Sequence, residues 1–289
     1  MKISGFSIAR NISKFDYPAV ESINSILPIC DNFVVAVGNS EDDTLAKIKS
    51  IHPAKINILE TIWDDTKRVG GIVLADETNK AFQAIENDAD WCFYIQADEV
   101  VHEDDLNIIY ESCKEHLNNN KVEGLLFKYK HFYGSYDYIA TSRKWYNSEV
   151  RIIRNNKKIK SYKDAQGFRL DSRKLKVKAI DAYINHYGWV KHPLFQQKKQ
   201  EHFNKLWHDD VWIKQNVPKQ SEFDYSNIDK LEKFTGTHPL VMYSRVESQN
   251  WHFDFDITKN NKSTKNKILD WLENISGKEI ARYRNYELI

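Results

Sequence analysis

Two adjacent carboxylates, Asp98 and Glu99, follow an apolar and aromatic run at residues 91–95 (Trp-Cys-Phe-Tyr-Ile). The run has the length of a fully buried strand in a parallel sheet. Open α/β sheets bind ligands beyond the carboxyl ends of such strands, where carboxylates can hold a hard divalent cation and the cation can hold a diphosphate. A strand that ends in a solvated acidic turn gives the same pattern. The neighbouring segments must therefore decide between a binding site and an ordinary turn.

Three further segments carry polar groups that a doubly wound sheet would bring to the same edge. Residues 9–11 (Ala-Arg-Asn) and 38–43 (Gly-Asn-Ser-Glu-Asp-Asp) each follow an apolar run, and residues 68–71 (Arg-Val-Gly-Gly) precede a helical pattern. With residues 96–99 they offer backbone N–H groups, a guanidinium, amides and carboxylates, which suit a nucleotide diphosphate with a metal. The sequence has neither a G-x-G-x-x-G turn after its first strand nor a Walker loop, which disfavours hydride transfer and ATP hydrolysis.

The elements that would position these segments alternate between strand and helix over the first 120 residues. Strands are expected at 2–8, 32–37, 55–61 and 91–95, and helices at 18–27, 41–51, from the glycine pair to about 86, and at 104–119. Strands that alternate with helices of this length indicate βαβ units. The sequence therefore predicts an α/β fold with a mostly parallel, doubly wound sheet.

After residue 120 the pattern changes. Strands are expected at 124–133, 149–154, 175–181 and 182–189, with a tyrosine-rich loop at 133–145. Residues 193–289 are predicted to form a helical, aromatic-rich C-terminal extension, which ends in a helix containing Leu272. We find no repeat and no long linker, so one compact unit with an appended tail is the simplest interpretation.

The order of these motifs resembles a known enzyme family. Residues 8–11 (Ile-Ala-Arg-Asn), 34–44 (Val-Val-Ala-Val-Gly-Asn-Ser-Glu-Asp-Asp-Thr), 78–82 (Thr-Asn-Lys-Ala-Phe) and 91–99 follow one another along the chain. They resemble family 2 of the glycosyltransferases, which has the GT-A fold and the motifs D-x-G-S-x-D-x-T, R-N-x-A and L-D-A-D-E in this order. The resemblance covers about the first 105 residues well and residues 186–189 more loosely. Order and spacing, rather than any single motif, carry it.

The resemblance implies a GT-A-like core and a hexosyltransferase-type enzyme. Such an enzyme moves a sugar from a nucleotide-sugar donor to an acceptor hydroxyl, usually with inversion and with a divalent metal (Mn²⁺ or Mg²⁺). By position, Asp98 would be the metal-binding carboxylate of the D-x-D motif. The residues expected to contact the nucleotide sugar are Ala9, Arg10, Asn11, Asn39, Asp42, Arg68, Asn79, Gln96 and Ala97. Residues 1–120 would then be the nucleotide-sugar-binding half of the core, and residues 121–192 its acceptor-binding half.

Three positions depart from the family pattern. Gln96 replaces the first aspartate of D-x-D, which lowers the local negative charge and makes Gln96 the position where metal binding could differ. Val37 and Gly38 occupy the place where the family often has an aspartate that recognises the nucleotide base, so the identity of the nucleotide base is not predicted. Thr78 replaces the arginine before Asn79, and Arg68 is our candidate to supply that charge.

An inverting transfer also needs a base, because a carboxylate must deprotonate the acceptor hydroxyl during displacement at the anomeric carbon. Asp164, in a basic, glycine-containing loop, is our first choice; Glu99, Glu149 and Asp137 are the alternatives. An ordinary loop acid, paired with Lys163 or Arg169, would fit the sequence around Asp164 equally well.

Residues 186–189 (His-Tyr-Gly-Trp) supply a second candidate metal ligand. His186 could complete the metal shell, as a late histidine does in several GT-A enzymes, or it could be a hydrogen-bonded core residue. Five aromatic residues near the acceptor half could stack on a sugar or simply pack together. They are Tyr133, Tyr136, Tyr138, Trp145 and Tyr146.

Charge and cysteine usage bound the partners and the compartment. Net charge is +1, but residues 151–178 hold eleven Lys and Arg against two Asp. This basic strip suits phosphates, an anionic acceptor or peripheral contact with the inner face of a membrane, and it could equally be a solvated face. Nucleic acid is not expected. Three cysteines without metal-ligand spacing, no apolar run long enough to span a membrane and no signal peptide pattern predict a cytoplasmic protein.

The sequence thus predicts a metal-dependent, inverting glycosyltransferase that builds a surface polysaccharide, glycan or glycolipid on a glycan or lipid-linked acceptor. A non-catalytic nucleotide- or sugar-binding relative is the main alternative, because Gln96 removes one carboxylate. A nucleotidylyltransferase shares a sheet of this kind but is disfavoured, because no glycine-rich phosphate loop follows the first strand.

Overall fold

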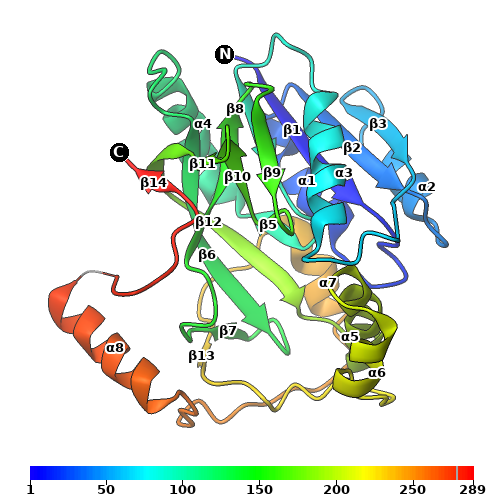
Figure 1. Cartoon of the computed structure of the whole chain (residues 1–289), viewed down its shortest axis with the longest axis vertical. Helices are drawn as coiled ribbons and strands as arrows, with labels where there is room; N and C mark the ends of the chain where they lie inside the picture. The colour runs from blue at the N-terminus through cyan, green and yellow to red at the C-terminus, as the bar shows by residue number, and fades with distance from the viewer. Residues whose placement is uncertain (278) are drawn as a thin grey trace.

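The computed structural model describes residues 1–277 and 279–289 and has a mixed α/β architecture built on one large sheet (Figure 1). Its strands are β1 (Ile3–Ala9), β2 (Asn32–Gly38), β3 (Ile56–Thr61), β4 (Trp91–Tyr94), β5 (Glu99–Val101), β6 (Gly124–Tyr133), β7 (Tyr138–Ala140), β8 (Ser148–Arg154), β12 (Lys176–Trp189), β13 (Leu231–Lys233) and β14 (Glu287–Leu288). The strand order along the main path is β13-β7-β6-β8-β4-β1-β2-β3.

The half of the sheet that contains β1 to β4 is parallel, as predicted. β1 pairs in parallel with both β2 and β4, and β2 pairs in parallel with β3. β8 then enters antiparallel between β4 and β6, whereas β6 and β12 are parallel to each other. The prediction of a mostly parallel α/β sheet is confirmed, and β8 is the antiparallel strand that joins its two halves.

The two faces of the sheet are covered differently (Figure 1). The helices α1 (Ala19–Ile26), α2 (Thr44–Lys49) and α4 (Leu106–Glu115) pack on one face through a core that includes Ile23, Ile48 and Ile109. On the other face lie α3 (Ile72–Gln83) and a separate small sheet of β9 (Ile159–Tyr162), β10 (Gly167–Leu170) and β11 (Arg173–Lys174). Phe82 of α3 and Phe168 of β10 both pack against Phe6, so the small sheet completes the layer that α3 begins.

Two strand predictions differ from the structure near the functional edge. Residues 175–181 and 182–189 were expected as two strands, but β12 is one long strand with an irregularity in its pairing between Ala179 and Tyr183. The bulge keeps β12 paired to β6 on both sides of the break, so the chain does not turn. β5, which was not expected, pairs antiparallel with β12 and sets Glu99 opposite His186.

The C-terminal extension is only partly helical. Its helices are α5 (Pro193–Phe203), α6 (Asp210–Asn216), α7 (Tyr243–Glu247) and α8 (Thr264–Ser276). β13 and β14 return to the large sheet by pairing with β7 and β12. α8 is held to the core by an ion pair between Arg143 and Glu273, yet its apolar side, including Trp271, is exposed. Within the described residues, none of the helices combines the length and apolar character required to cross a membrane.

Four cations of the basic strip of residues 151–178 are engaged within the fold. Arg151 and Arg169 are buried, and Arg154 donates to the carbonyl oxygens of Leu117 and Val122 beyond the end of α4. Arg173 forms an ion pair with Glu123. Several of these cations therefore stabilise the fold. The three cysteines are buried free thiols, as expected.

Candidate active site

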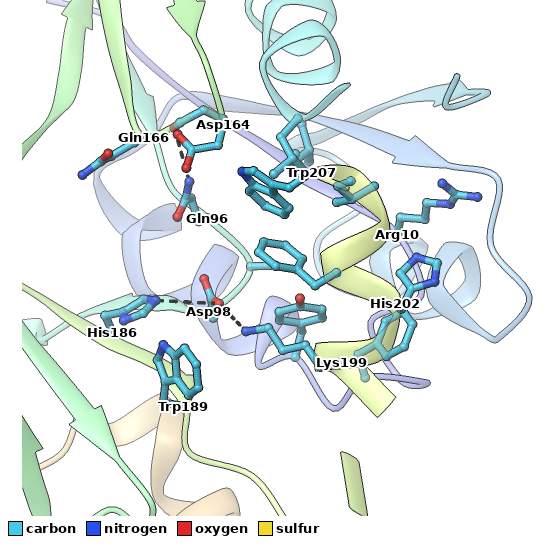
Figure 2. A pocket seen from close by; sticks show the side chains of 18 of the residues that line it. Arg10, Gln96, Asp98, Asp164, Gln166, His186, Trp189, Lys199, His202 and Trp207 are labelled. Carbon is cyan, nitrogen blue, oxygen red and sulfur yellow. Dashed lines mark hydrogen bonds and ion pairs between the residues drawn. The ribbon is translucent and has the colours of Figure 1, made fainter. Parts of the chain in front are cut away.

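A cavity of about 520 Å³ lies at the carboxyl ends of β1 and β4 (Figure 2). We call it the inner cavity. Its wall combines Arg10 after β1, residues 96–98 after β4, residues 164–166 between β9 and β10, the end of β12, and α5 with the turn that follows it. The polar and charged residues labelled around it are Arg10, Gln96, Asp98, Asp164, Gln166, His186, Lys199 and His202. Four distant parts of the sequence therefore meet where the doubly wound sheet was predicted to bind its ligand.

Asp98 lies at the centre of the inner cavity. The pairing of β5 with β12 brings His186 beside it, and the backbone N–H of Tyr187 donates to the carbonyl oxygen of Asp98 at 2.8 Å. Asp98 Oδ2 is 3.8 Å from His186 Nε2 and 3.4 Å from Lys199 Nζ. Figure 2 shows His186 and Lys199 on opposite sides of the carboxylate. A carboxylate, an imidazole and an ammonium thus converge on one point.

The charges around Asp98 keep it ionised. Burial alone would raise the pKa of the Asp98 carboxyl, but the electrostatic effect of Lys199, with further contributions from His186 and Lys191, outweighs burial and lowers that pKa below its ordinary value. Burial lowers the pKa of His186, and the negative charge of Asp98 opposes that effect. A lowered pKa keeps the imidazole neutral over more of the physiological range, which is the form that binds metals.

Asp98 Oδ2 and His186 Nε2 place two potential metal-donor atoms 3.8 Å apart. A Cβ atom added at Gly188 would lie 2.6 Å from His186 Nε2 and 2.7 Å from Asp98 Oδ2, so the missing side chain leaves room beside both donor atoms. One carboxylate oxygen and one imidazole nitrogen are ligands that Mn²⁺ accepts. Within residues 1–277 and 279–289, no group of three or more His, Cys, Asp and Glu is arranged to hold a metal. A metal here would therefore depend on substrate and water for its remaining ligands.

Gln96 faces the neighbouring loop. Its side-chain amide donates to the carbonyl oxygen of Ala165 at 3.3 Å and to the hydroxyl of Tyr94 at 3.4 Å. An aspartate could not make the contact with the Ala165 carbonyl oxygen, because an ionised carboxylate has no proton to donate. The departure at Gln96 thus joins the Asp98 turn to the loop that carries Asp164.

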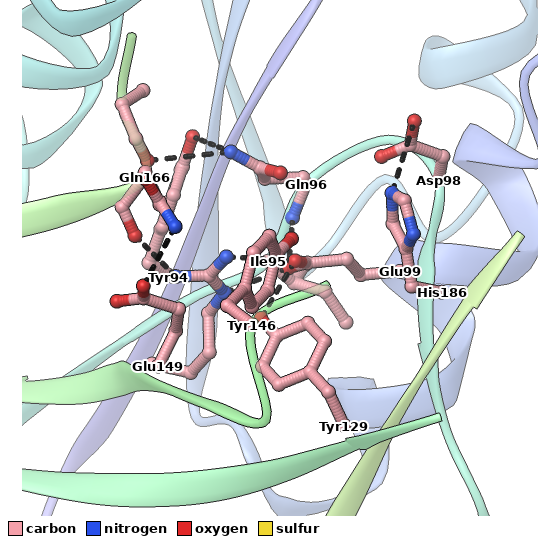
Figure 3. A network of polar contacts seen from close by, with 12 residues as sticks. Tyr94, Ile95, Gln96, Asp98, Glu99, Tyr129, Tyr146, Glu149, Gln166 and His186 are labelled. Carbon is pink, nitrogen blue, oxygen red and sulfur yellow. Dashed lines mark hydrogen bonds and ion pairs between the residues drawn. The ribbon is translucent and has the colours of Figure 1, made fainter. Parts of the chain in front are cut away.

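Glu99 does not face the inner cavity. Its carboxylate is fully buried and accepts hydrogen bonds from Arg151, the Tyr129 hydroxyl and the backbone N–H of Gln96 (Figure 3). The prediction of Glu99 as an alternative base is wrong for this geometry, because an acceptor hydroxyl cannot reach a carboxylate enclosed by these donors. Its role is to hold the turn that presents Asp98.

Asp164 remains as the candidate base. Among the described residues that line the inner cavity, Asp98 and Asp164 are the only carboxylates. Asp164 forms no ion pair with any residue that the structure describes, so the expected alternative pairing with Lys163 or Arg169 is absent there. Arg169 instead donates to the carbonyl oxygens of Phe168 and Asn285. The Asp164 carboxylate is therefore available to a substrate.

The other two alternative bases lie elsewhere. Glu149 is buried behind Gln166, whose side-chain amide donates to it at 2.8 Å, and burial raises the pKa of Glu149 to about 7. Asp137 is in the turn after β6, where its backbone N–H and its carboxylate contact the Ser135 hydroxyl. Neither side chain lines the inner cavity.

The residues predicted to bind the nucleotide divide into two groups and one core residue, Ala9. Arg10, Gln96 and Ala97 line the inner cavity. Arg10 is held by Asp65, to which its Nη2 donates at 2.9 Å, and its guanidinium lies 5.2 Å from the ring centroid of Trp63. Ala9 is buried in the core that packs against α1.

The second group braces loops around the inner cavity. Asn11 accepts a hydrogen bond from the Glu41 N–H, and Asp42 accepts one from the Lys14 N–H. The remaining members behave likewise: Asn39 accepts from the Trp63 N–H, Asn79 accepts from the Ser161 N–H, and Arg68 donates to the carbonyl oxygens of Lys205 and His208. These residues position the wall without forming it.

Sequence reasoning missed the contribution of α5 and the turn after it. Lys199, His202 and Trp207 all line the inner cavity, and His202 packs on Phe15 with ring centroids 4.7 Å apart. His192 caps α5 and Pro193 is its first residue, so the helix begins just after β12 and folds back over the site. The sequence predicted an aromatic-rich helical extension here, but nothing in it indicated which surface the extension covers.

Comparisons with known proteins give fold-level likenesses. No family model matches the chain, and no curated protein matches it significantly. Residues 1–349 of S. aureus TarS match with a TM-score of 0.40 and 17% identity over 76% of this chain and 67% of that one. The structure of the same TarS segment with UDP-GlcNAc matches with a TM-score of 0.39 and 18% identity over 76% of this chain and 68% of that one. A third match is glucosyl-3-phosphoglycerate synthase from Mycobacterium tuberculosis in complex with Mn²⁺, UDP and glucosyl-3-phosphoglycerate. Its TM-score is 0.29, with 17% identity over 46% of this chain and 44% of that one.

The chain therefore spans about two thirds of the TarS segment and less than half of the mycobacterial synthase. These similarities are too low to support an inference about function. The function must therefore be inferred from the geometry of the inner cavity.

Proposed function

We propose that this protein transfers a sugar from a nucleotide-sugar donor to an acceptor hydroxyl, with inversion at the anomeric carbon. The observation that carries the proposal is the meeting of Asp98, His186, Lys199 and Asp164 in the inner cavity. With a divalent metal bound, Asp98, His186 and Lys199 would hold a negatively charged leaving group. The fourth residue, Asp164, is a carboxylate without an ion-pair partner among the described residues. The motif order in residues 8–99 supports the same class of reaction.

The donor half of the reaction needs positive charge at the diphosphate. Asp98 and His186 would hold a divalent metal beside Gly188, and a bound metal would neutralise charge on the diphosphate as it leaves. Lys199 adds a fixed ammonium on the other side of Asp98, and its Nζ is also held by the carbonyl oxygen of Gly188 at 2.9 Å. Arg10, beside the Trp63 ring, adds a guanidinium to the same wall.

The acceptor half needs a base on the opposite side of the sugar. In our proposal, the acceptor oxygen forms a bond to the anomeric carbon while the bond from that carbon to the diphosphate oxygen breaks. The nucleoside diphosphate leaves with the bonding electrons, and the acceptor proton passes to Asp164. The support for Asp164 is its place in the cavity lining without a cationic partner among the described residues.

The test is to measure nucleotide binding and sugar transfer separately. Calorimetry with UDP, GDP and dTDP, each with Mn²⁺ and with EDTA, shows which nucleotide the protein binds and whether binding depends on the metal. Transfer is then followed with the matching nucleotide sugars for wild type and Asp98→Ala. We expect Asp98→Ala to lose metal-dependent binding and transfer. If no nucleotide binds, or if Asp98→Ala is as active as wild type, the proposal fails.

A non-catalytic binding protein is the second candidate, and Gln96 is the observation that favours it. With one carboxylate replaced, the inner cavity could retain a nucleotide sugar without breaking it. Nucleotide affinity that EDTA leaves unchanged, together with no release of sugar over hours, would favour this candidate. For an active enzyme, the motif order makes a surface polysaccharide or glycan the expected product class.

A further inference from the structure

A second cavity, of about 630 Å³, adjoins the first. We call it the outer cavity. Lys144, Trp189 and Gln200 line both cavities, so the two share a wall. The outer cavity is also lined by Tyr133 and Trp145 from the core, by α6 and by residues 217–229 from the C-terminal extension. Its volume lies within the range of small-molecule binding sites.

Aromatic rings form much of the wall of the outer cavity, and Trp189 stands at their centre. The Trp189 ring is stacked with Tyr133 at 5.8 Å between centroids, perpendicular to Trp145 at 6.0 Å and tilted against Phe223 at 5.8 Å. Trp212 of α6 is 37% exposed and lies flat on His208. Exposed indole faces of this kind match the apolar faces of pyranose rings.

Amide side chains supply the polar groups between these rings. Gln200 and Asn227 have no side-chain hydrogen bond to any residue that the structure describes. Asn204 and Asn216 donate to helix carbonyl oxygens through Nδ2, which leaves their Oδ1 atoms as acceptors. Neutral donors and acceptors around aromatic faces suit a ligand that is rich in hydroxyl groups.

Charge in the outer cavity argues against an anionic ligand. Lys144 is the single Lys or Arg among the described residues that line it, and its Nζ donates to Asp229 at 2.9 Å. The other carboxylate, Asp224, accepts hydrogen bonds from the N–H and hydroxyl of Ser226. A phosphate or carboxylate would meet two acids and one paired lysine, whereas the inner cavity presents Arg10 and Lys199.

We propose that the outer cavity binds the acceptor and that the acceptor is a neutral saccharide. Its rings would lie between Trp212 and Trp189, and its reacting hydroxyl would pass Trp189 into the inner cavity, where Asp164 takes the proton. This inference rests on the proposed glycosyl transfer, since it assigns the acceptor of that reaction.

The experiment measures saccharide binding in the presence of the nucleotide that binds wild type. The probes are maltotriose, cellotriose and N-acetylchitotriose as neutral saccharides, and glycerol phosphate as an anionic acceptor. Calorimetry is performed on wild type, Trp212→Ala, Trp212→Tyr and, as a matched control, Trp271→Ala on the exposed side of α8. We expect at least one trisaccharide to bind wild type, with about tenfold weaker binding to Trp212→Ala. Trp212→Tyr should recover most of the affinity, and Trp271→Ala should match wild type.

The outcomes separate this inference from the function on which it rests. If wild type binds no nucleotide, the proposed glycosyl transfer fails and the inference fails with it. If a nucleotide binds but no neutral trisaccharide does, or if glycerol phosphate binds instead, only the inference is overturned. Equal trisaccharide affinity in Trp212→Ala and Trp271→Ala also overturns it, because binding would then lie outside the outer cavity.

Discussion

Glu99 and Arg151 form a buried ion pair that joins the two loops of the inner cavity. Arg151 Nη2 is 2.7 Å from Glu99 Oε1, its Nε is 2.8 Å from Oε2, and both side chains are 0% exposed. Glu99 also accepts the N–H of Gln96, two residues before Asp98, while Arg151 donates to the carbonyl oxygen of Gln166, two residues after Asp164. The Glu99–Arg151 ion pair therefore holds together the loops that carry Asp98 and Asp164, although it contacts neither of these two carboxylates.

Breaking this pair should destabilise the whole protein. Glu99→Gln leaves the Arg151 guanidinium buried without a counter-charge, which typically costs about 3–5 kcal/mol. Urea unfolding should show a large loss in the free energy of unfolding. Asp181→Asn is the control, because it removes an exposed partner of Lys128 and should leave the unfolding midpoint nearly unchanged. Equal midpoints for the two variants would contradict a structural role for the buried pair.

Lys199, the cation next to Asp98, should contribute more to nucleotide binding than Lys198, its neighbour in sequence. Lys199→Gln removes the ammonium 3.4 Å from Asp98, and we expect nucleotide diphosphate binding to weaken by about tenfold, the size of a charge-assisted contact. Lys198→Gln, on the exposed side of α5, should bind as wild type does. The measurement is the dissociation constant of the nucleotide at fixed ionic strength. Similar losses in both variants would indicate general electrostatic attraction instead of a contact from Lys199.

The parallel half of the fold could be predicted from the sequence because its signals are local. Apolar runs at 32–37 and 91–95 and the helical spacing at 104–119 each reflect the period of one element. The small sheet of β9 to β11 and the pairing of β5 could not be predicted in the same way, because strands of two to four residues are too short to show a period. Their positions depend on partners distant in the sequence.

The adjacent acids Asp98 and Glu99 show where site prediction stops. Neighbouring residues of an extended chain point to opposite sides, so at most one of the pair could face the inner cavity. Which one does so depends on the register of β5 against β12, and the sequence contains no information about that register. Lys199 was missed for a related reason, since α5 reaches Asp98 only through the path of the chain after β12.

Replacing the candidate base should affect turnover much more than donor binding. Asp164→Asn keeps the size of the side chain and removes its ability to accept a proton, so kcat should fall by roughly 10²–10⁴-fold. The dissociation constant of the nucleotide should change little. Asp171→Asn, an exposed acid after β10, is the control and should retain full turnover. An active Asp164→Asn enzyme would move the base to another residue.

Glu149 should make stability depend on pH. Burial raises its pKa to about 7 in the folded protein, above the ordinary value of 4.5, so the folded state binds this proton more tightly than the unfolded state. The contribution is fully present below about pH 4.5 and is lost as pH rises through about 7, with a total of about 3 kcal/mol. In urea unfolding, the free energy of unfolding should therefore fall less between pH 5 and pH 8 for Glu149→Gln than for wild type. Parallel pH profiles for the two proteins would show that Glu149 does not titrate in this range.

Metal binding should be sensitive to a single methyl group at Gly188. An alanine there places Cβ within 2.7 Å of both His186 Nε2 and Asp98 Oδ2, closer than carbon atoms approach nitrogen or oxygen without a bond. His186 or Asp98 must then shift, so Mn²⁺ affinity in Gly188→Ala should fall by more than tenfold, as measured by calorimetry with the nucleotide present. Nucleotide binding in EDTA provides the internal control, because it depends on Arg10, Lys199 and the aromatic wall and should be retained. Weaker nucleotide binding in EDTA as well would mean that the methyl group disturbs the inner cavity as a whole. Unchanged Mn²⁺ affinity would place the metal away from Asp98 and His186.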